Sequence, residues 1–237
     1  MRPLLLPFSL LVALVVTSCQ TSLKPSGYLG SVDTVMKKEP SLPFSRSWKN
    51  PEADLASYTR LEVRPMRTKD LRELRGVARI NVRNATERVR RDAETLATLG
   101  TRELAKELGR SPNRKLRVTT QPSRDTGTLL VETNLVEVEP GRPSMQLLNF
   151  FVPFTSSLNR PAIGIEGRLV DANSGEVLFA FSDLERAEIS FFDLQRFSYY
   201  GVQRRELKRW GSQLREVVES NGRSLVRDAF PVQIVNW

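Results

Sequence analysis

Histidine is absent from the 237 residues of the chain. It is the only side chain whose unperturbed pKa lies near neutrality, and it is the commonest metal ligand in proteins. Its absence excludes Ser-His-Asp and Cys-His catalysis, as well as zinc hydrolases and haem sites that depend on histidine. The sequence therefore predicts no metal centre and no cofactor.

Cysteine occurs once, at Cys19, and the apolar run before it is too short to cross a membrane. Residues 4–16 form an apolar core of 13 residues after Arg2, whereas a transmembrane helix needs about 20. This pattern is typical of a cleaved export signal. Val16-Thr17-Ser18-Cys19 is similar to the bacterial lipobox, in which the signal is cut before the cysteine and the thiol is diacylated. The alternative is an ordinary export signal followed by a chance cysteine.

Composition divides the chain into three parts. Residues 1–18 are the predicted lipoprotein signal peptide, and their removal leaves enough chain for one domain and a tether. Residues 19–57 are rich in proline and glycine turns, which predicts the lipidated cysteine followed by a tether and an irregular N-terminal arm. Residues 58–237 are predicted to form a single domain. The net charge of +9 is compatible with nucleic acid, with an anionic membrane or cell-wall surface as partner, or with plain solvation, and export argues against nucleic acid.

The hydropathy pattern predicts an α+β fold, with a mixed or antiparallel sheet of about five to six strands and two main helices packed on one face. A slip in the apolar phase near Leu135 and Val136 indicates a β-bulge. Glycine at position 100, within the apolar stripe of the first helix, suggests close approach to a sheet. The predicted strands span residues 58–64, 116–120, 128–138, 162–170, 176–182 and 230–237, and the predicted helices span residues 84–108 and 202–220.

The segment Gly164–Glu185 resembles a family of bacterial lipoproteins that carries a domain of unknown function, number 3313. The shared pattern is a strand, a D-x-x-[TS]-G-E turn and a return strand that ends at an aspartate. The matching residues here are Asp171, Ser174, Gly175, Glu176 and Asp183, and further matches are Ser26–Leu29, Tyr58 and Leu207–Trp210. The family has no assigned enzymatic activity, so the resemblance implies an exported, lipid-anchored domain.

Two groups of acidic residues allow a chemical interpretation. Glu132, Glu137, Glu139 and Glu166 lie on predicted strands, where two carboxylates can approach to the roughly 5–10 Å that a glycosidase needs. The solvated face of a sheet has the same pattern. The turn at residues 171–176 has oxygen ligands for calcium but lacks the twelve-residue loop spacing, which favours a role in stabilising the turn.

An apolar run and a basic stretch are the predicted binding surfaces. Residues 145–154 are either a buried core segment or an exposed docking patch for a partner protein or the membrane. The basic stretch of residues 60–91 faces anionic headgroups or cell-wall polymers, or is a solvated helix face. The candidate binding residues are Leu147, Leu148, Phe150, Phe151, Phe154, Arg83, Arg88 and Arg91.

These observations predict a non-enzymatic cell-envelope lipoprotein that binds the membrane through the lipid on Cys19. Gln20, rather than aspartate, follows the cysteine, which favours the periplasmic face of the outer membrane. The domain is expected to be a binding or scaffolding module for an envelope protein complex or for peptidoglycan. The alternative is a histidine-free carboxylate hydrolase that acts on envelope glycans.

Overall fold

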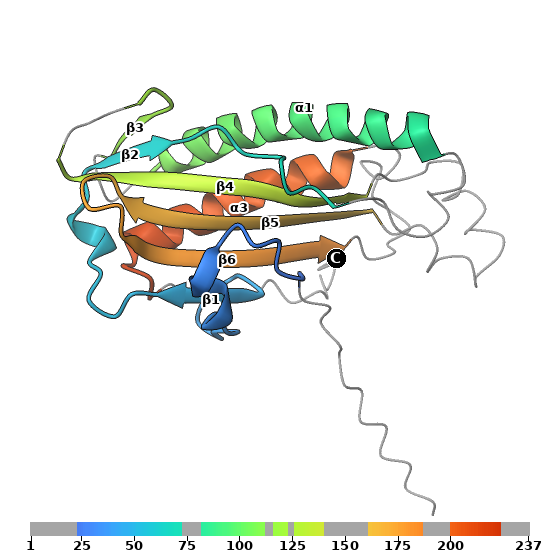
Figure 1. The fold of residues 1–237 in the computed structure, drawn as a ribbon. Coiled ribbons are helices and arrows are strands. Elements are labelled where there is room, and N and C mark those ends of the chain that lie inside the picture. The colour runs from blue at the N-terminus through green and yellow to red at the C-terminus, as the bar shows by residue number, and fades with distance from the viewer. Residues whose placement is uncertain are drawn as a thin grey trace, which may run out of the picture.

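A six-stranded mixed sheet covered by two helices on one face forms the fold (Figure 1). The computed structural model describes residues 23–72, 82–111, 116–122, 126–139, 161–186 and 200–223. The strand order is β1-β6-β5-β4-β2-β3. The prediction of an α+β fold with two main helices and an irregular N-terminal arm is confirmed.

The strands are β1 (Arg46–Lys49), β2 (Arg60–Val63), β3 (Arg117–Thr119), β4 (Thr128–Glu139), β5 (Ala162–Asp171) and β6 (Val177–Arg186). The helices are α1 (Val82–Leu108) and α3 (Gly201–Glu219), and two short 3-10 helices are η1 (Gly30–Thr34) and η2 (Leu55–Ser57). β2 pairs in parallel with β3 and β4, and all other neighbours are antiparallel. A parallel pair needs a crossover connection, which α1 supplies between β2 and β3.

The two helices pack against each other on the same face of the sheet, where the main core lies. The apolar stripe of α1 is buried as its spacing predicts, from Val89 through Ala93 to Leu104. A Cβ at Gly100 would lie 2.7 Å from Met66 Cε and 2.9 Å from Leu207 Cδ2. Glycine at this position therefore allows close approach to α3 and to the chain after β2, in place of the expected contact with a sheet.

β4, β5 and β6 form the centre of the sheet. The register of β4 against β5 shifts between Leu135 and Glu137, so the predicted bulge is present. Leu169 faces Phe179 across the hairpin. Phe181 lies opposite Gly167, and its ring occupies the space that a Cβ at that position would need.

The N-terminal arm packs on the domain from Leu23 onward. Leu23 and Leu29 are buried against the sheet, and β1 extends the sheet beside β6. Phe44 is fully buried, with its ring 4.3 Å from that of Phe181. Figure 1 shows η1 over β1 and β6, on the face opposite the helices. This face of the sheet is called the open face below.

Three sequence predictions concern residues outside the described part of the chain: the signal peptide with Cys19, the apolar run 145–154 and the strand 230–237. Within the described ranges, neither long helix combines the length and the apolar character needed to cross a bilayer.

Candidate functional site

The turn between β5 and β6 is closed by the carboxylate of Asp171. Its Oδ1 accepts hydrogen bonds from the backbone N–H groups of Asn173 (2.9 Å) and Ser174 (2.7 Å). Its Oδ2 accepts a hydrogen bond of 2.6 Å from the Tyr58 hydroxyl. The hydrogen bond from Tyr58 is the largest cause that holds the pKa of Asp171 below its usual value. Both oxygens serve the packing of the turn, which agrees with a structural role.

Asp183 is a buried carboxylate on β6 that joins three elements. Its Oδ1 accepts hydrogen bonds from the backbone N–H (3.0 Å) and the hydroxyl (2.5 Å) of Ser45, just before β1. Its Oδ2 accepts a hydrogen bond from the indole Nε1 of Trp210 on α3. A buried charge without partners is strongly destabilising. These three donors therefore explain how an aspartate that is 2% exposed is accommodated in the core.

Ser26 and Tyr28 hold the N-terminal arm on the open face. The backbone N–H of Ser26 donates to Glu166 Oε1 at 3.0 Å, and the Ser26 hydroxyl donates to Oε2. Burial raises the pKa of Glu166, and the hydrogen bonds from Ser26 oppose this rise. The guanidinium carbons of Arg67 and Arg168 each lie 5.1 Å from the centre of the Tyr28 ring. Burial raises the pKa of Tyr28 to about 12, so its hydroxyl stays protonated at neutral pH.

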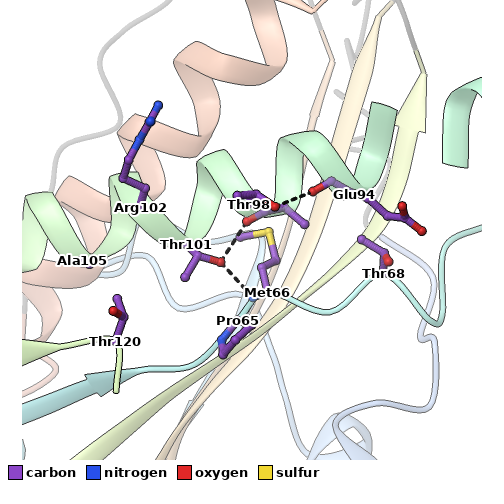
Figure 2. Close-up of a pocket in the computed structure, with 10 residues that line it drawn as sticks. Pro65, Met66, Thr68, Glu94, Thr98, Thr101, Arg102, Ala105 and Thr120 are labelled. Carbon is purple, nitrogen blue, oxygen red and sulfur yellow. Dashed lines mark hydrogen bonds between the residues drawn. The ribbon is translucent and has the colours of Figure 1, made fainter. Parts of the chain in front are cut away.

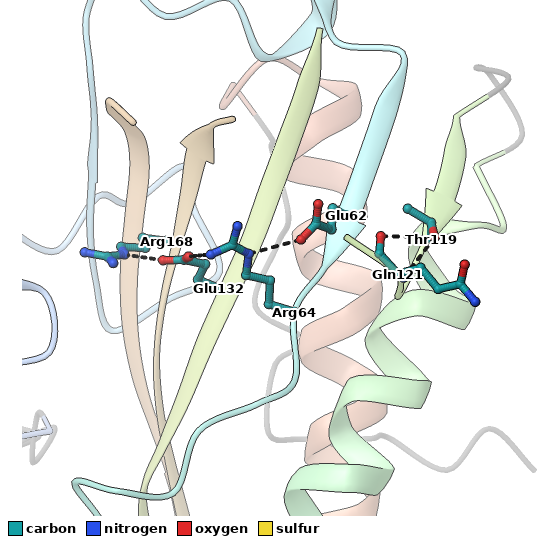
Figure 3. Close-up of polar contacts among 6 residues, drawn as sticks. All are labelled: Glu62, Arg64, Thr119, Gln121, Glu132 and Arg168. Carbon is teal, nitrogen blue, oxygen red and sulfur yellow. Dashed lines mark hydrogen bonds and ion pairs between the residues drawn. The ribbon is translucent and has the colours of Figure 1, made fainter. Parts of the chain in front are cut away.

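A row of alternating charges crosses the open face over β2, β4 and β5 (Figure 3). Arg64 contacts Glu62 Oε1 at 3.1 Å through Nε and Glu132 Oε1 at 2.9 Å through Nη1. The second oxygen of Glu132 accepts a hydrogen bond of 2.8 Å from Arg168 Nε. Both oxygens of Glu132 are therefore engaged by arginine.

A second ion-pair group lies where β4 and β6 end. Glu137 lies 3.5 Å from Arg72 and 3.0 Å from Arg186, and Arg186 also lies 3.5 Å from Glu139. Arg72 in addition donates a hydrogen bond to the backbone carbonyl of Lys24 in the arm. This group therefore ties the first described residues of the chain to the end of the sheet.

Arginine is the more exposed partner in both groups. The side chain of Arg64 is 47% exposed, against 3% for Glu62. The side chain of Arg186 is 33% exposed, against 8% for Glu137. The open face consequently turns guanidinium groups outward and holds its carboxylates inward.

Glu185, at the end of β6, has an unusual titration. Burial raises its pKa to about 7; Arg209 opposes the rise, and the charges of Asp183 and Glu206 add to it. Arg209 contacts Glu185 through Nη2 and Glu206 through Nε at 2.8 Å. A raised pKa is what the hydrolase hypothesis requires of a general acid. Here, however, one guanidinium bridges the two glutamates and links β6 to α3.

An open groove of about 570 Å³ lies between α1 and the chain that follows β2 (Figure 2). The backbone N–H of Met66 donates to Thr101 Oγ1 at 2.9 Å, and the Thr101 hydroxyl donates to the carbonyl of Ala97 at 2.9 Å. These bonds hold α1 on the chain after β2. Glu94 is the one acid among the residues that line the groove, whereas a glycosidase needs two carboxylates. Across the described ranges, no cluster of three or more acidic or cysteine side chains is placed to hold a metal ion.

The structure places some of the predicted binding residues. Arg88 and Arg91 are exposed on α1, and this helix covers the face of the sheet opposite the open face. Arg83 lies on α1, and its side chain is outside the described part. Cys19 and the five apolar candidates Leu147, Leu148, Phe150, Phe151 and Phe154 are also outside it. Glu139 and Ala162, the strand residues on either side of that run, pair with each other at the end of the sheet.

The residues that carry the family resemblance contact one another or neighbouring elements, although they are far apart in sequence. Tyr58 contacts Asp171, Trp210 contacts Asp183, and Ser26 contacts Glu166 within the hairpin segment. The family model described as a protein of unknown function, DUF3313, matches residues 24–190. The chain belongs to this family. The DUF3313 match begins in the N-terminal arm and continues beyond β6, so it includes Ser26, Tyr58, Asp171 and Asp183.

No curated protein matches the chain. Among solved structures, the PelC dodecamer from Paraburkholderia phytofirmans is similar with 10% identity and a TM-score of 0.41, covering 71% of this chain and 96% of that chain. Protein XCC0632 from Xanthomonas campestris, of the family DUF330, is similar with 11% identity and a TM-score of 0.37, covering 73% and 90%.

Sequence reasoning missed Ser45 altogether, and it missed the ion pairs of Arg72 and Arg209. Each acts through a partner that is distant in the chain or on another element: Ser45 and Asp183 are separated by 138 positions. A serine before a strand carries no local signal of such a partner. The return aspartate of the family pattern marked Asp183, the partner of Ser45, but no sequence signal marked the partners of Arg72 and Arg209.

Proposed function

We propose that this member of the DUF3313 family is a cell-envelope lipoprotein whose domain is a non-enzymatic binding or scaffolding module. The lipobox-like segment Val16–Cys19 after a short apolar signal supports an acyl anchor on Cys19. Each buried methylene of an acyl chain contributes about 0.8 kcal/mol, and more than one chain makes the anchoring stable. Gln20 after the cysteine supports the periplasmic face of the outer membrane as the location.

The observation that best supports a non-enzymatic domain is that the carboxylates on the sheet are bound by arginine and serine side chains of the protein itself. Glu132 is held at both oxygens by arginine, Glu137 by two arginines, and Glu166 by Ser26. A general acid or base must reach the proton that it transfers on a substrate. Carboxylates that are inward and occupied by internal partners support a structural use of these residues.

The proposed partner is a protein of an envelope complex or the cell wall. The proposed docking groups are the apolar candidates of residues 147–154 and the basic residues Arg83, Arg88 and Arg91. The apolar residues of 147–154 follow Glu139 and precede Ala162, which pair beside Gly164. Leu23 packs on Gly164. The strand ends on either side of the apolar run therefore lie near the point where the described arm begins, which supports a docking site close to the membrane.

Mass spectrometry of the protein from its native membrane tests the anchor. The expected mass lacks residues 1–18 and carries a diacylglycerol-modified Cys19. The variant Cys19→Ser is expected to leave the membrane fraction. An unmodified thiol in the native protein, or an intact signal, would contradict the proposal.

Crosslinking in intact cells tests the docking groups. Phe151→Glu is expected to abolish a crosslinked partner while leaving the melting temperature unchanged, and Arg88→Gln with Arg91→Gln tests the basic group in the same way. A fall in melting temperature for Phe151→Glu would instead identify a core segment. Glu216→Gln, at a side chain that is 40% exposed on α3, is the matched control.

Incubation of the purified protein with isolated cell-wall glycan tests the hydrolase alternative. No release of soluble sugar is expected. Release that disappears in Glu185→Gln would establish the hydrolase, because Glu185 has the pKa of about 7 that suits a general acid.

A further inference from the structure

The N-terminal arm becomes part of the domain only four positions after Cys19. Leu23 is 1% exposed, and its Cδ1 touches the position that a Cβ at Gly164 would take on β5. Arg72 holds the carbonyl of Lys24, and Ser26 is hydrogen-bonded to Glu166. These contacts fix the place at which the chain reaches the domain.

The distance from the anchor to this place is short. Gln20, Thr21 and Ser22 are the only residues between Cys19 and Leu23. Even fully extended, four steps of chain reach about 14 Å. If Cys19 is acylated, the open face at Leu23 lies within that distance of the lipid headgroups.

The open face also has the surface chemistry that suits anionic headgroups. Lys24, Arg64 and Arg67 are exposed there. The two carboxylates that pair with Arg64, those of Glu62 and Glu132, are less exposed than its guanidinium group. Val35, at the end of η1, is 55% exposed and is the one large hydrophobic residue exposed in the described part of the chain. The outer surface of α1 lies a sheet and a helix layer away, roughly 20 Å.

We propose that the open face of the sheet, with Lys24, Arg64, Arg67 and the outer side of η1, is the surface that lies on the membrane and binds anionic phospholipid headgroups. This inference rests on the proposed acylation of Cys19. It directs α1, with Arg88 and Arg91, away from the bilayer, where these residues are accessible to a soluble partner. The guanidinium groups suit phosphate oxygens because they offer paired N–H donors.

Contact quenching by headgroup-labelled lipid tests the orientation. The acylated full mature chain is placed in phosphatidylethanolamine vesicles with and without phosphatidylglycerol, with a fluorophore at Ser31→Cys on η1 or at Glu87→Cys on α1. Both positions are exposed, and acylation blocks the thiol of Cys19. Strong quenching at position 31 and little at position 87 is expected. The proposed orientation is overturned if chains that float with the vesicles show equal quenching at the two positions, no quenching at either, or the reverse order. The proposed lipid anchor is not affected by that result.

Neutralising the cations of the open face tests their contact with the lipid headgroups. The quantity measured is the ratio of chains whose open face lies on the membrane to chains whose open face is detached, taken from the quenching at position 31. A cation near an anionic surface contributes roughly fivefold to such an equilibrium constant, so Lys24→Gln with Arg67→Gln is expected to lower this ratio by roughly 25-fold. The matched pair Arg88→Gln with Arg91→Gln is expected to leave it unchanged. Lys24→Gln alone gives about fivefold and leaves the contact of Arg67 with Tyr28 intact. Loss in the α1 pair, or no effect of the open-face pair, overturns the proposal. Failure of the chain to float, with an unmodified Cys19 by mass spectrometry, contradicts the lipoprotein proposal itself.

Discussion

The indole of Trp210 donates a buried hydrogen bond of 2.7 Å to the carboxylate of Asp183. It joins α3 to the end of the β5–β6 hairpin, and Ser45 completes the shell of the same carboxylate from the arm. Three segments of the chain thus meet at one charged group inside the core. Because the group is buried, the fold depends on all three segments being in place.

Trp210→Phe tests this junction. The variant keeps an aromatic ring in the core but removes the donor to Asp183 Oδ2, and a buried hydrogen bond to a charged group contributes roughly 1.5–3 kcal/mol. A loss of about 2 kcal/mol in the free energy of unfolding is expected from urea denaturation. Trp48→Phe on β1 is the control, since Trp48 is only partly buried. An equal loss in the two variants would contradict the role of the hydrogen bond.

Gly167→Ala tests the packing between β5 and β6. A Cβ at this position would overlap the ring of Phe181, which is itself stacked on Phe44. Overpacking of a rigid core site costs roughly 1–3 kcal/mol. We expect a loss of about 2 kcal/mol by urea denaturation, partly recovered when Phe181→Leu is added. Gly109→Ala, where the nearest atom is 3.3 Å away, should cause no such loss.

Tyr58→Phe should change both stability and its pH dependence. The Tyr58 hydroxyl is the largest cause of the lowered pKa of Asp171, whose usual value is 3.8. A lowered pKa stabilises the folded chain above the unfolded value, and this contribution is lost as the pH falls through the folded value. We expect Tyr58→Phe to cost about 1 kcal/mol at neutral pH and less in acid. Urea midpoints measured at pH 7 and at about pH 3 check this, and the same loss at both pH values would argue against it.

Glu185→Gln should reduce the loss of stability that accompanies a rise in pH from 4.5 to 7. The pKa of Glu185 is raised from 4.5 to about 7, so the folded chain keeps a proton that the unfolded chain releases between these values. Because of this proton, the free energy of unfolding falls as the pH rises from 4.5 to 7. With its side chain 32% exposed, the screened contribution is about 1–2 kcal/mol.

Melting curves at pH 5 and pH 8 measure this difference between the wild type and Glu185→Gln. Glu216→Gln, at a side chain that is 40% exposed on α3, should retain the wild-type pH dependence. A Glu185→Gln variant with an unchanged pH dependence would show that Glu185 titrates normally.

Local patterns predicted most of the elements. The apolar stripe of α1, the slip in β4 and the turn at Asp171 are properties of neighbouring residues, and each is present. The family resemblance is confirmed by the match over residues 24–190. The acidic residues were harder to interpret. An acid on the solvated face of a strand and an acid in a cleft have the same alternation, so sequence could not distinguish Glu132, held by two arginines, from Glu185, held near pKa 7.

The sequence by itself predicted both long helices and the strands β2 to β6, but not β1 in the N-terminal arm. It also excluded histidine chemistry and predicted the acyl site at Cys19. It could do so because periodicity, composition and short motifs are local. Only the tertiary structure decided that Ser26 holds Glu166 across 140 positions and that arginines face outward from inward carboxylates. Those relations depend on strand order and on which groups lose contact with water, and both are set when the whole chain packs.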